Sequence, residues 1–136
     1  MALADIIDKV IDIVKVDTNL KGTYWGDQMG YSAYPVACVA SSLLEEEFPV
    51  IARQLVRDEK YTVEIIIYVK LEDTLANCKS IITLTDTMRA ALRGDLTLGD
   101  YVYQSKMGAS KFLFWASGNI LLRFSVTTVE YIKRIG

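Results

Sequence analysis

The chain has 136 residues, of which 51% are hydrophobic and 24% are charged, and its 15 Lys and Arg residues stand against 17 Asp and Glu residues for a net charge of −2. These values predict one folded domain, residues 1–136, and exclude intrinsic disorder. The near balance of charge excludes a basic field that attracts nucleic acid, and the positive mean hydropathy of +0.23 indicates apolar surface that a partner covers.

The first part of the chain predicts a helix followed by an irregular segment. Apolar residues recur at helical spacing over Leu3–Val14, with aspartates on the other side. Val16–Tyr34 carries glycines and aromatic side chains without a clear period, so we expect a long loop. Its aromatic side chains either pin the loop to the surface or contact a partner, and Trp25 and Tyr31 are the candidate contact residues.

The next segment contains the least certain boundaries. Pro35–Ser41 predicts a short strand with proline at its start, and we interpret Glu45–Glu47 as part of a solvated turn. Pro49–Tyr61 fits either one helical turn or a hairpin whose turn is Asp58–Lys60. We favour the hairpin, because the strand that follows needs an antiparallel neighbour.

The clearest elements of the chain are the strand and the helix that come next. Tyr61–Leu71 alternates strictly, and every odd-numbered residue in it is apolar. Asp73–Arg93 has a wide apolar stripe at helical spacing, and arginines near its end suit a helix C-terminus. Gly94 is expected to end this helix in the left-handed conformation.

The last third of the chain predicts three strands. The predicted strands are Tyr101–Lys106, Phe112–Ser117 and Ile120–Tyr131. A turn at Leu98–Asp100 precedes the first strand, a hairpin loop at Met107–Lys111 joins the first to the second, and a two-residue turn at Gly118–Asn119 joins the second to the third. The whole pattern predicts an α+β fold, mainly an antiparallel β-sheet with a long helix and an N-terminal helix packed on one face.

The second face of the long strands is expected to be less polar than a face in water. It is predicted to mix apolar and polar side chains: Ile66, Tyr68, Leu121, Val129 and Tyr131 among Thr62, Glu64, Lys70, Arg123 and Thr127. Partial cover by neighbouring subunits explains this mixture, and so does cover by the aromatic loop.

The chemistry available to the chain is limited. It has no histidine, which removes the commonest general base and the usual nucleophile pairs. Cys38 and Cys78 are expected to be small buried hydrophobes rather than a disulfide. Neither a phosphate-binding glycine motif nor a membrane-spanning run is present, and charges within Ala2–Val16 argue against a signal peptide. We therefore expect a cytoplasmic protein that is not an enzyme, with no catalytic residue, no metal and no cofactor.

The order of elements resembles a known family. Its segments are Tyr34–Val36, Thr62–Val69, the helix Asp73–Arg93 followed by Leu96–Val102, and Leu122–Val126. In this order they resemble the tail terminator and tail completion proteins of long-tailed bacteriophages, over most of the chain from Leu3 to Tyr131.

The resemblance implies a virion assembly protein, made in the host cytoplasm and placed in the tail or neck region. Such proteins form a sixfold ring on the head-proximal end of the tail tube, stop its polymerisation and offer a surface to the head connector or stopper protein. DNA passes through the ring without sequence-specific binding, and no membrane is involved. Candidate lumen residues are Glu64, Lys70, Arg123 and Thr127. Candidate contacts with a neighbouring subunit or the tube lie on a projecting hairpin and the aromatic loop: Arg53, Arg57, Asp58, Glu59 and Lys60, with Trp25 and Tyr31.

Two other hypotheses remain open at this stage. The chain is alternatively another neck or tail protein, such as a head–tail stopper or the tube protein, and only a tube protein polymerises on its own. A small ligand-binding α+β domain is the hypothesis from a different class. A buried pocket lined by Tyr24, Trp25 or Tyr68 with a perturbed carboxylate favours it.

Overall fold

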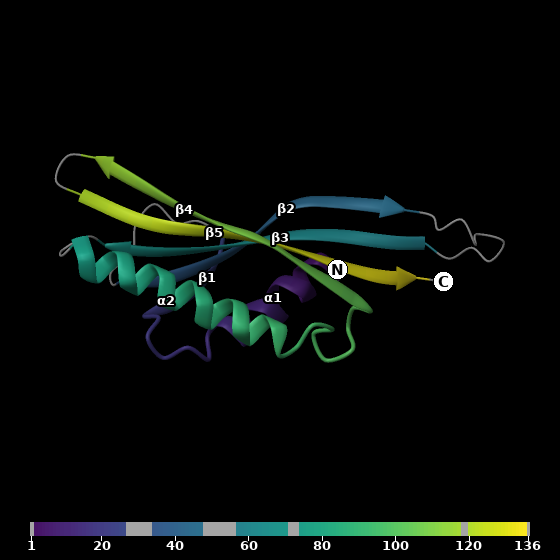
Figure 1. The fold of residues 1–136 in the computed structure, drawn as a ribbon. Coiled ribbons are helices and arrows are strands. Elements are labelled where there is room, and N and C mark those ends of the chain that lie inside the picture. Colours follow the sequence, from purple (N-terminus) through teal and green to yellow (C-terminus); the bar gives the residue numbers. More distant parts are fainter. Residues whose placement is uncertain (1, 27–33, 48–56, 71–73, 118–119, 136) are drawn as a thin grey trace.

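The computed structural model describes residues 2–26, 34–47, 57–70, 74–117 and 120–135. Within them the elements follow in this order: α1 (Ala2–Val14), β1 (Gly22–Trp25), β2 (Val36–Glu47), β3 (Arg57–Lys70), α2 (Thr74–Arg93), β4 (Gln104–Ser117) and β5 (Ile120–Ile135). The strands form one sheet in the order β1-β2-β3-β5-β4, in which β1 and β2 run parallel and the other described pairs run antiparallel. Both helices lie on the same face of this sheet (Figure 1). This is the predicted α+β architecture.

The core lies between the two helices and that face of the sheet. The odd-numbered residues of β3 from Tyr61 to Val69 are all at most 5% exposed, which confirms the alternation seen in the sequence. The helices contribute residues at helical spacing: Ile6, Ile7, Val10 and Val14 from α1, and Ile81, Leu84, Met88 and Leu92 from α2. Ile82, which was expected in the apolar stripe, is instead 50% exposed.

Strand β2 is longer than predicted and changes the interpretation of its neighbours. It runs on to Glu47, so Glu45–Glu47 lie in a strand and not in a turn. Asp58–Lys60 likewise lie inside β3, and the antiparallel neighbour of β3 is β2. The turn prediction failed because charged residues are read as solvated, whereas here Glu45 stands opposite Lys60 in register, where opposite charges stabilise a strand pair.

The predicted hairpin loop at Met107–Lys111 is a bulge within one continuous strand, β4. The register with β5 shifts between Met107 and Ser110, and Arg89 of α2 donates hydrogen bonds to the Gly108 carbonyl at 2.8 Å and to Ser110 Oγ at 2.9 Å. A Cβ on Gly108 would lie 2.9 Å from the Thr128 carbonyl oxygen. The glycine therefore serves close backbone approach at a bulge rather than a chain reversal, and two strands follow α2 instead of three.

Two smaller differences concern the segments around the helices. The segment after α1 contains β1, a strand of four residues beside β2, which is too short to leave a periodic signal. Gly94 donates to the Ala90 carbonyl at 3.1 Å but is not among the residues with positive φ. After α2, positive φ angles occur at Leu98 (51°), Gly99 (66°) and Asp100 (67°), which confirms the turn predicted there. Hydrogen bonding of the Gly99 amide to Asp95 Oδ1 at 2.9 Å holds this turn in place.

Candidate functional site

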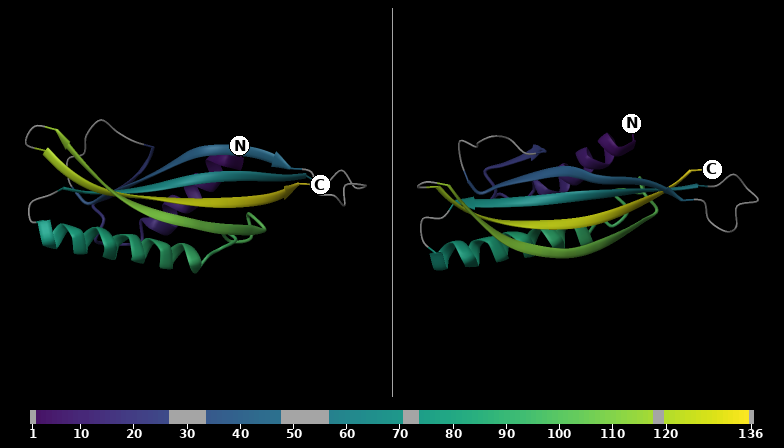
Figure 2. Two further views of the ribbon diagram at one scale, coloured as in Figure 1. Left: turned by 45° about the horizontal axis from the view of Figure 1, so that its top comes forward. Right: turned by 90° about the horizontal axis from the view of Figure 1, so that it is seen from above.

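No helix or strand of the described residues covers the face of the sheet opposite α1 and α2 (Figures 1 and 2). The register identifies its residues, because directly opposed residues in an antiparallel pair share a face. Ser125 stands opposite Ile67, and its hydroxyl oxygen lies 2.8 Å from that of Thr85 on α2. Odd-numbered residues of β3 and β5 therefore face the helices, and even-numbered residues form the open face.

The centre of the open face is apolar. Ile66 stands opposite Val126, and Tyr68 stands opposite Phe124 with ring centroids 5.5 Å apart. All four are only partly buried. Polar residues lie around them on the same face: Thr62, Glu64, Lys70, Thr128 and Glu130. An antiparallel sheet whose second face meets water is normally more polar at its centre, so this face has the composition of a contact surface.

The four predicted lumen residues do not share one face. Glu64 and Lys70 lie on the open face, opposite Thr128 and Leu122. Thr127 is fully buried under the helices, where its hydroxyl bonds to Ser110 Oγ at 2.7 Å. Arg123 also belongs to the helix-side set, because it stands opposite Val69. The prediction failed because the register between two strands that are distant in sequence decides which faces combine.

Val129 and Tyr131 require the same correction. Both were expected on the second face, yet they stand opposite Val63 and Tyr61 and are at most 2% exposed. Burial raises the pKa of the Tyr131 hydroxyl well above its ordinary value, and the nearby charge of Asp95 adds to this shift.

The outer edge of β4 carries a second apolar surface, which was not predicted from the sequence as a contact surface. Phe112, Leu113 and Phe114 are 52%, 46% and 54% exposed, and β4 is the last strand on its side of the sheet. Three successive large apolar residues in a strand place hydrophobic side chains on both faces. The sequence predicted only a strand at Phe112–Ser117, but on an edge strand this run is an exposed patch.

Arg123 lies beside this patch. Its guanidinium carbon is 5.8 Å from the centroid of the Phe114 ring, and its Nε atom is buried without a hydrogen-bond partner among the described residues. A buried donor without a partner is unfavourable. The Nε–H group of Arg123 is therefore an unsatisfied hydrogen-bond donor at the helix-side border of β4.

The described residues that were expected on a projecting hairpin, 57–60, form part of the sheet. Arg57 begins β3, and Asp58 stands opposite Arg134 of β5. Arg134 donates to both carboxylate oxygens of Asp58, at 2.8 and 3.1 Å. These hydrogen bonds hold the pKa of Asp58 below its ordinary value. Glu59 and Lys60 continue the strand.

The remaining predicted contact residues are Trp25, Tyr31 and Arg53. Trp25 ends β1 and is 51% exposed, and its indole N–H donates to Asp8 of α1 at 2.7 Å. This bond ties β1 to the first helix, so Trp25 has a structural role whatever else it contacts. Tyr31 and Arg53 lie outside the described residues.

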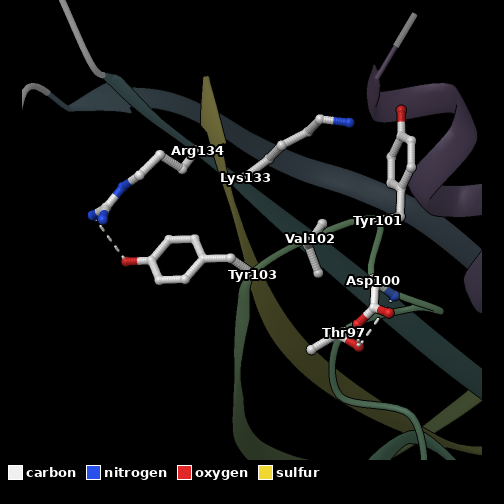
Figure 3. A pocket seen from close by; sticks show the side chains of 7 residues that line it. All are labelled: Thr97, Asp100, Tyr101, Val102, Tyr103, Lys133 and Arg134. Atoms are coloured by element: carbon white, nitrogen blue, oxygen red, sulfur yellow. Dashed lines mark hydrogen bonds between the residues drawn. The ribbon is translucent and has the colours of Figure 1, made fainter. Parts of the chain in front are cut away.

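Two shallow hollows were considered as ligand sites. One lies at the C-terminal end of β5 (Figure 3) and is lined by Thr97, Asp100, Tyr101, Val102, Tyr103, Lys133 and Arg134. Its cations already have partners: the Lys133 ammonium lies 3.5 Å from the Tyr101 ring centroid, and Arg134 contacts Tyr103 as well as Asp58. The other is lined by Asn19, Pro35, Lys79, Ser80, Thr83 and Leu84. Neither contains Tyr24, Trp25 or Tyr68, the residues that the ligand-binding hypothesis required.

The described part of the chain has neither a metal-binding cluster nor a membrane-spanning helix. No group of three or more Cys, Asp or Glu side chains there is placed to hold a metal ion. No helix there has the length and apolar character needed to cross a membrane.

Comparison with known proteins finds similarity in fold but none in sequence. No family model and no curated protein matches the sequence. Among solved structures, the fold is similar to a chain from the virion of a native gene transfer agent (GTA) particle, with 11% sequence identity, a TM-score of 0.42 and coverage of 96% of each chain. At this level the similarity does not identify a function, so the surfaces described above have to support any proposal.

Proposed function

We propose that this chain is a structural protein of a phage-like virion, and more specifically that it forms a ring on the head-proximal end of the tail tube. In this proposal the ring stops tube polymerisation and provides the surface that joins the head connector. The observation that carries it is the open face of the sheet, whose apolar centre at Ile66, Tyr68, Phe124 and Val126 is only partly buried. A protein that acts by assembly needs such a surface.

The arrangement of layers supports a ring with the helices outside. Since α1 and α2 cover one face only (Figure 2), the helices turn towards solvent and the open face turns inward, where its apolar centre contacts a neighbouring subunit or the tail tube and its polar residues border the lumen. In this orientation Glu64 and Lys70 line the lumen. The open face carries charges of both signs, with Glu64 and Glu130 beside Lys70, so the lumen has no strong basic field, which suits a conduit that passes DNA without holding it.

A structural role rather than an enzymatic one is part of the proposal. The sequence has no histidine, and the perturbed groups serve packing and strand pairing: Tyr131 is in the core, and Asp58 is bound to Arg134 across two strands. Perturbed groups that gather in a cleft are typical of a catalytic site. Tyr101 and Arg134, whose pKa values are also raised, line the hollow of Figure 3, but Tyr101 donates a hydrogen bond to Asp5 and Arg134 to Asp58.

The test is light scattering after size exclusion, followed by negative-stain imaging with and without tubes of the tail tube protein. Closed rings, or density that caps one end of the tubes, are expected. Open filaments formed by this protein alone would make it the tube protein instead. A monomer that leaves tubes uncapped would refute the proposal and return attention to ligand binding.

A further inference from the structure

Besides the outer edge of the short strand β1, the sheet has two longer free stretches of edge among the described residues. On one side β4 is the last strand. On the other side β1 pairs only with Val36–Val39 of β2, so no described strand pairs with the outer edge of Ala40–Glu47. Unpaired backbone N–H and C=O groups at such edges are templates for a further strand.

We propose that β4 of one copy of this chain pairs antiparallel with the distal half of β2 in a second copy. The register sets Leu113 opposite Leu43, Phe112 opposite Leu44 and Lys111 opposite Glu45 of the other copy. The inference rests on the proposed function, because it names the contact that joins neighbouring subunits of the ring.

Strand direction permits this pairing without inverting either copy. Successive neighbours from β2 to β3, β5 and β4 are all antiparallel, so β4 runs opposite to β2 within one subunit. Two copies placed side by side in the same orientation therefore bring β4 and β2 together as antiparallel strands. The contact is head to tail, the kind that closes into a ring when the rotation between copies allows it.

The helix-side faces of the two copies match in this register. Phe112 stands opposite Ser125, on the face that packs on α2, and is 52% exposed. In the other copy, Leu44 occupies a register position opposite the buried Tyr61, on the same face. An apolar residue therefore meets an apolar position, and the exposed Phe112 ring is covered. Shifting the register by one residue would pair opposite faces.

The open faces match as well. Leu113 stands opposite Phe124, and Leu43 of the other copy occupies a position opposite Thr62. Both positions belong to the open face, so the apolar centre of that face continues from one copy into the next. Shifting the register by two residues would keep the faces but set leucine against charged residues.

Charge also favours this register. The charged residues of β4 are Lys106 and Lys111, and those of β2 are Glu45–Glu47. Within one copy, Glu46 stands opposite Glu59 and Glu47 opposite Asp58, an arrangement of like charges that destabilises a strand pair. Lys111 from the neighbouring copy brings a cation to this acidic end.

The offset between copies agrees with ring geometry. Across one subunit, Lys111 is level with Cys38 through Val126 and Ile66, so the proposed register shifts the second copy along the strands from Cys38 to Glu45. Strands in closed sheets are tilted, and four spacings of about 4.8 Å at a tilt of about 45° give a stagger of about six residues. The shift of seven positions includes the irregularity of β2 between Ser41 and Leu43.

Charge reversal tests the register. Lys111→Glu is expected to raise the concentration needed for assembly about tenfold, because an attractive cross-strand pair becomes repulsive. Glu45→Lys is expected to weaken assembly for the same reason, but it also lowers the stability of the single copy because it sets a lysine opposite Lys60, so its assembly is compared at equal folded fraction. The variant that carries both changes is expected to recover assembly. Lys79→Glu on α2 is the control, since it makes the same charge change at an exposed lysine outside the proposed pairs; Lys106 does not serve, because it stands opposite Glu130 within one copy. Circular dichroism and thermal melting show whether each variant folds.

A cross-link tests the contact without relying on charge. Leu113→Cys and Leu43→Cys proteins, mixed and oxidised, are expected to form a disulfide-linked heterodimer, whereas wild-type protein with its own Cys38 and Cys78 is not. Absence of the cross-link, or a Lys111→Glu protein that assembles normally, would overturn the inference. Rings that cap tubes despite that failure would leave the proposed function standing. Cross-linked filaments that never cap a tube would keep the contact and refute the terminator role.

Discussion

The neighbouring residues Ile66 and Ile67 provide a test of the open face. They are the same residue type on the same strand, but Ile67 is completely buried beneath the helices and Ile66 is only partly buried on the open face. Replacing each by threonine keeps the β-branched shape, so strand propensity changes little. Any difference between the two variants therefore reports the environment of each face.

The expected sizes follow from burial. At Ile67, the change removes apolar volume at about 1 kcal/mol and buries a hydroxyl at about 1–3 kcal/mol, so we expect the free energy of unfolding to fall by about 2–4 kcal/mol. At Ile66 the hydroxyl reaches water, and we expect a loss of less than about 1 kcal/mol. Ile66→Thr should instead weaken assembly, because it places a polar group at the centre of the contact surface.

Urea unfolding followed by circular dichroism measures the first quantity, and mass photometry over a range of concentrations measures the second. The reasoning fails if both variants lose the same stability, because the open face would then be part of the monomer core. It also fails if Ile66→Thr folds and assembles like the wild type, because the open face would then have no partner.

Three further changes test the packing of the fold. Tyr131→Phe should reduce the loss of stability that the wild type shows above pH 10. Because the pKa of Tyr131 is raised in the folded chain, only the unfolded state ionises there, and the free energy of unfolding of the wild type falls by about 1.4 kcal/mol per pH unit. Urea titrations in which the variant and the wild type lose the same stability above pH 10 would contradict this. Gly108→Ala should destabilise the β4 bulge by about 1–3 kcal/mol, because its Cβ would crowd the Thr128 carbonyl at 2.9 Å; an unchanged melting temperature would argue against this close approach. Trp25→Phe should lower stability by no more than about 1 kcal/mol through loss of the indole bond to Asp8; a severe loss would mean that β1 has a larger role in the fold.

Local patterns in the sequence predicted the elements that repeat over many residues. The alternation of Tyr61–Leu71 and the helical stripe of Asp73–Arg93 correspond to β3 and α2. Such patterns depend on one buried face per element, which the sequence displays directly. The mixed character of the second sheet face was also predicted, although some of its members were wrong.

The failures share a physical cause, namely interactions between distant segments. The sequence of Glu45–Glu47 suggests a turn, but pairing with β3 makes these residues part of a strand. Gly108 suggests a hairpin, but its contacts with Arg89 and Thr128 place it in a bulge. The four predicted lumen residues lie on two different faces of the sheet, because the pairing of Val63 with Val129 fixes which faces of β3 and β5 combine. None of these relations has a local signal, and a one-residue change in register reverses every face.

The last prediction concerns the end of the sheet that presents Glu45–Glu47. There the bidentate contact between Arg134 and Asp58, with Tyr103 as a further partner at 3.2 Å, holds β5 and β3 together. A strand that is already ordered loses less entropy when a neighbour pairs with it, so Asp58→Asn should weaken assembly even though Asp58 touches no proposed partner.

The pH dependence separates this effect from a change in surface charge. Because the pKa of Asp58 is lowered in the folded chain, its stabilising contribution is present above the ordinary value of 3.8 and is lost as pH falls through the lower folded value. Wild type should therefore lose more stability than Asp58→Asn when urea unfolding is compared at pH 5 and below 3.8. Assembly of Asp58→Asn at neutral pH that equals the wild type would show that the ordered end of the sheet does not prepare β2 for its neighbour.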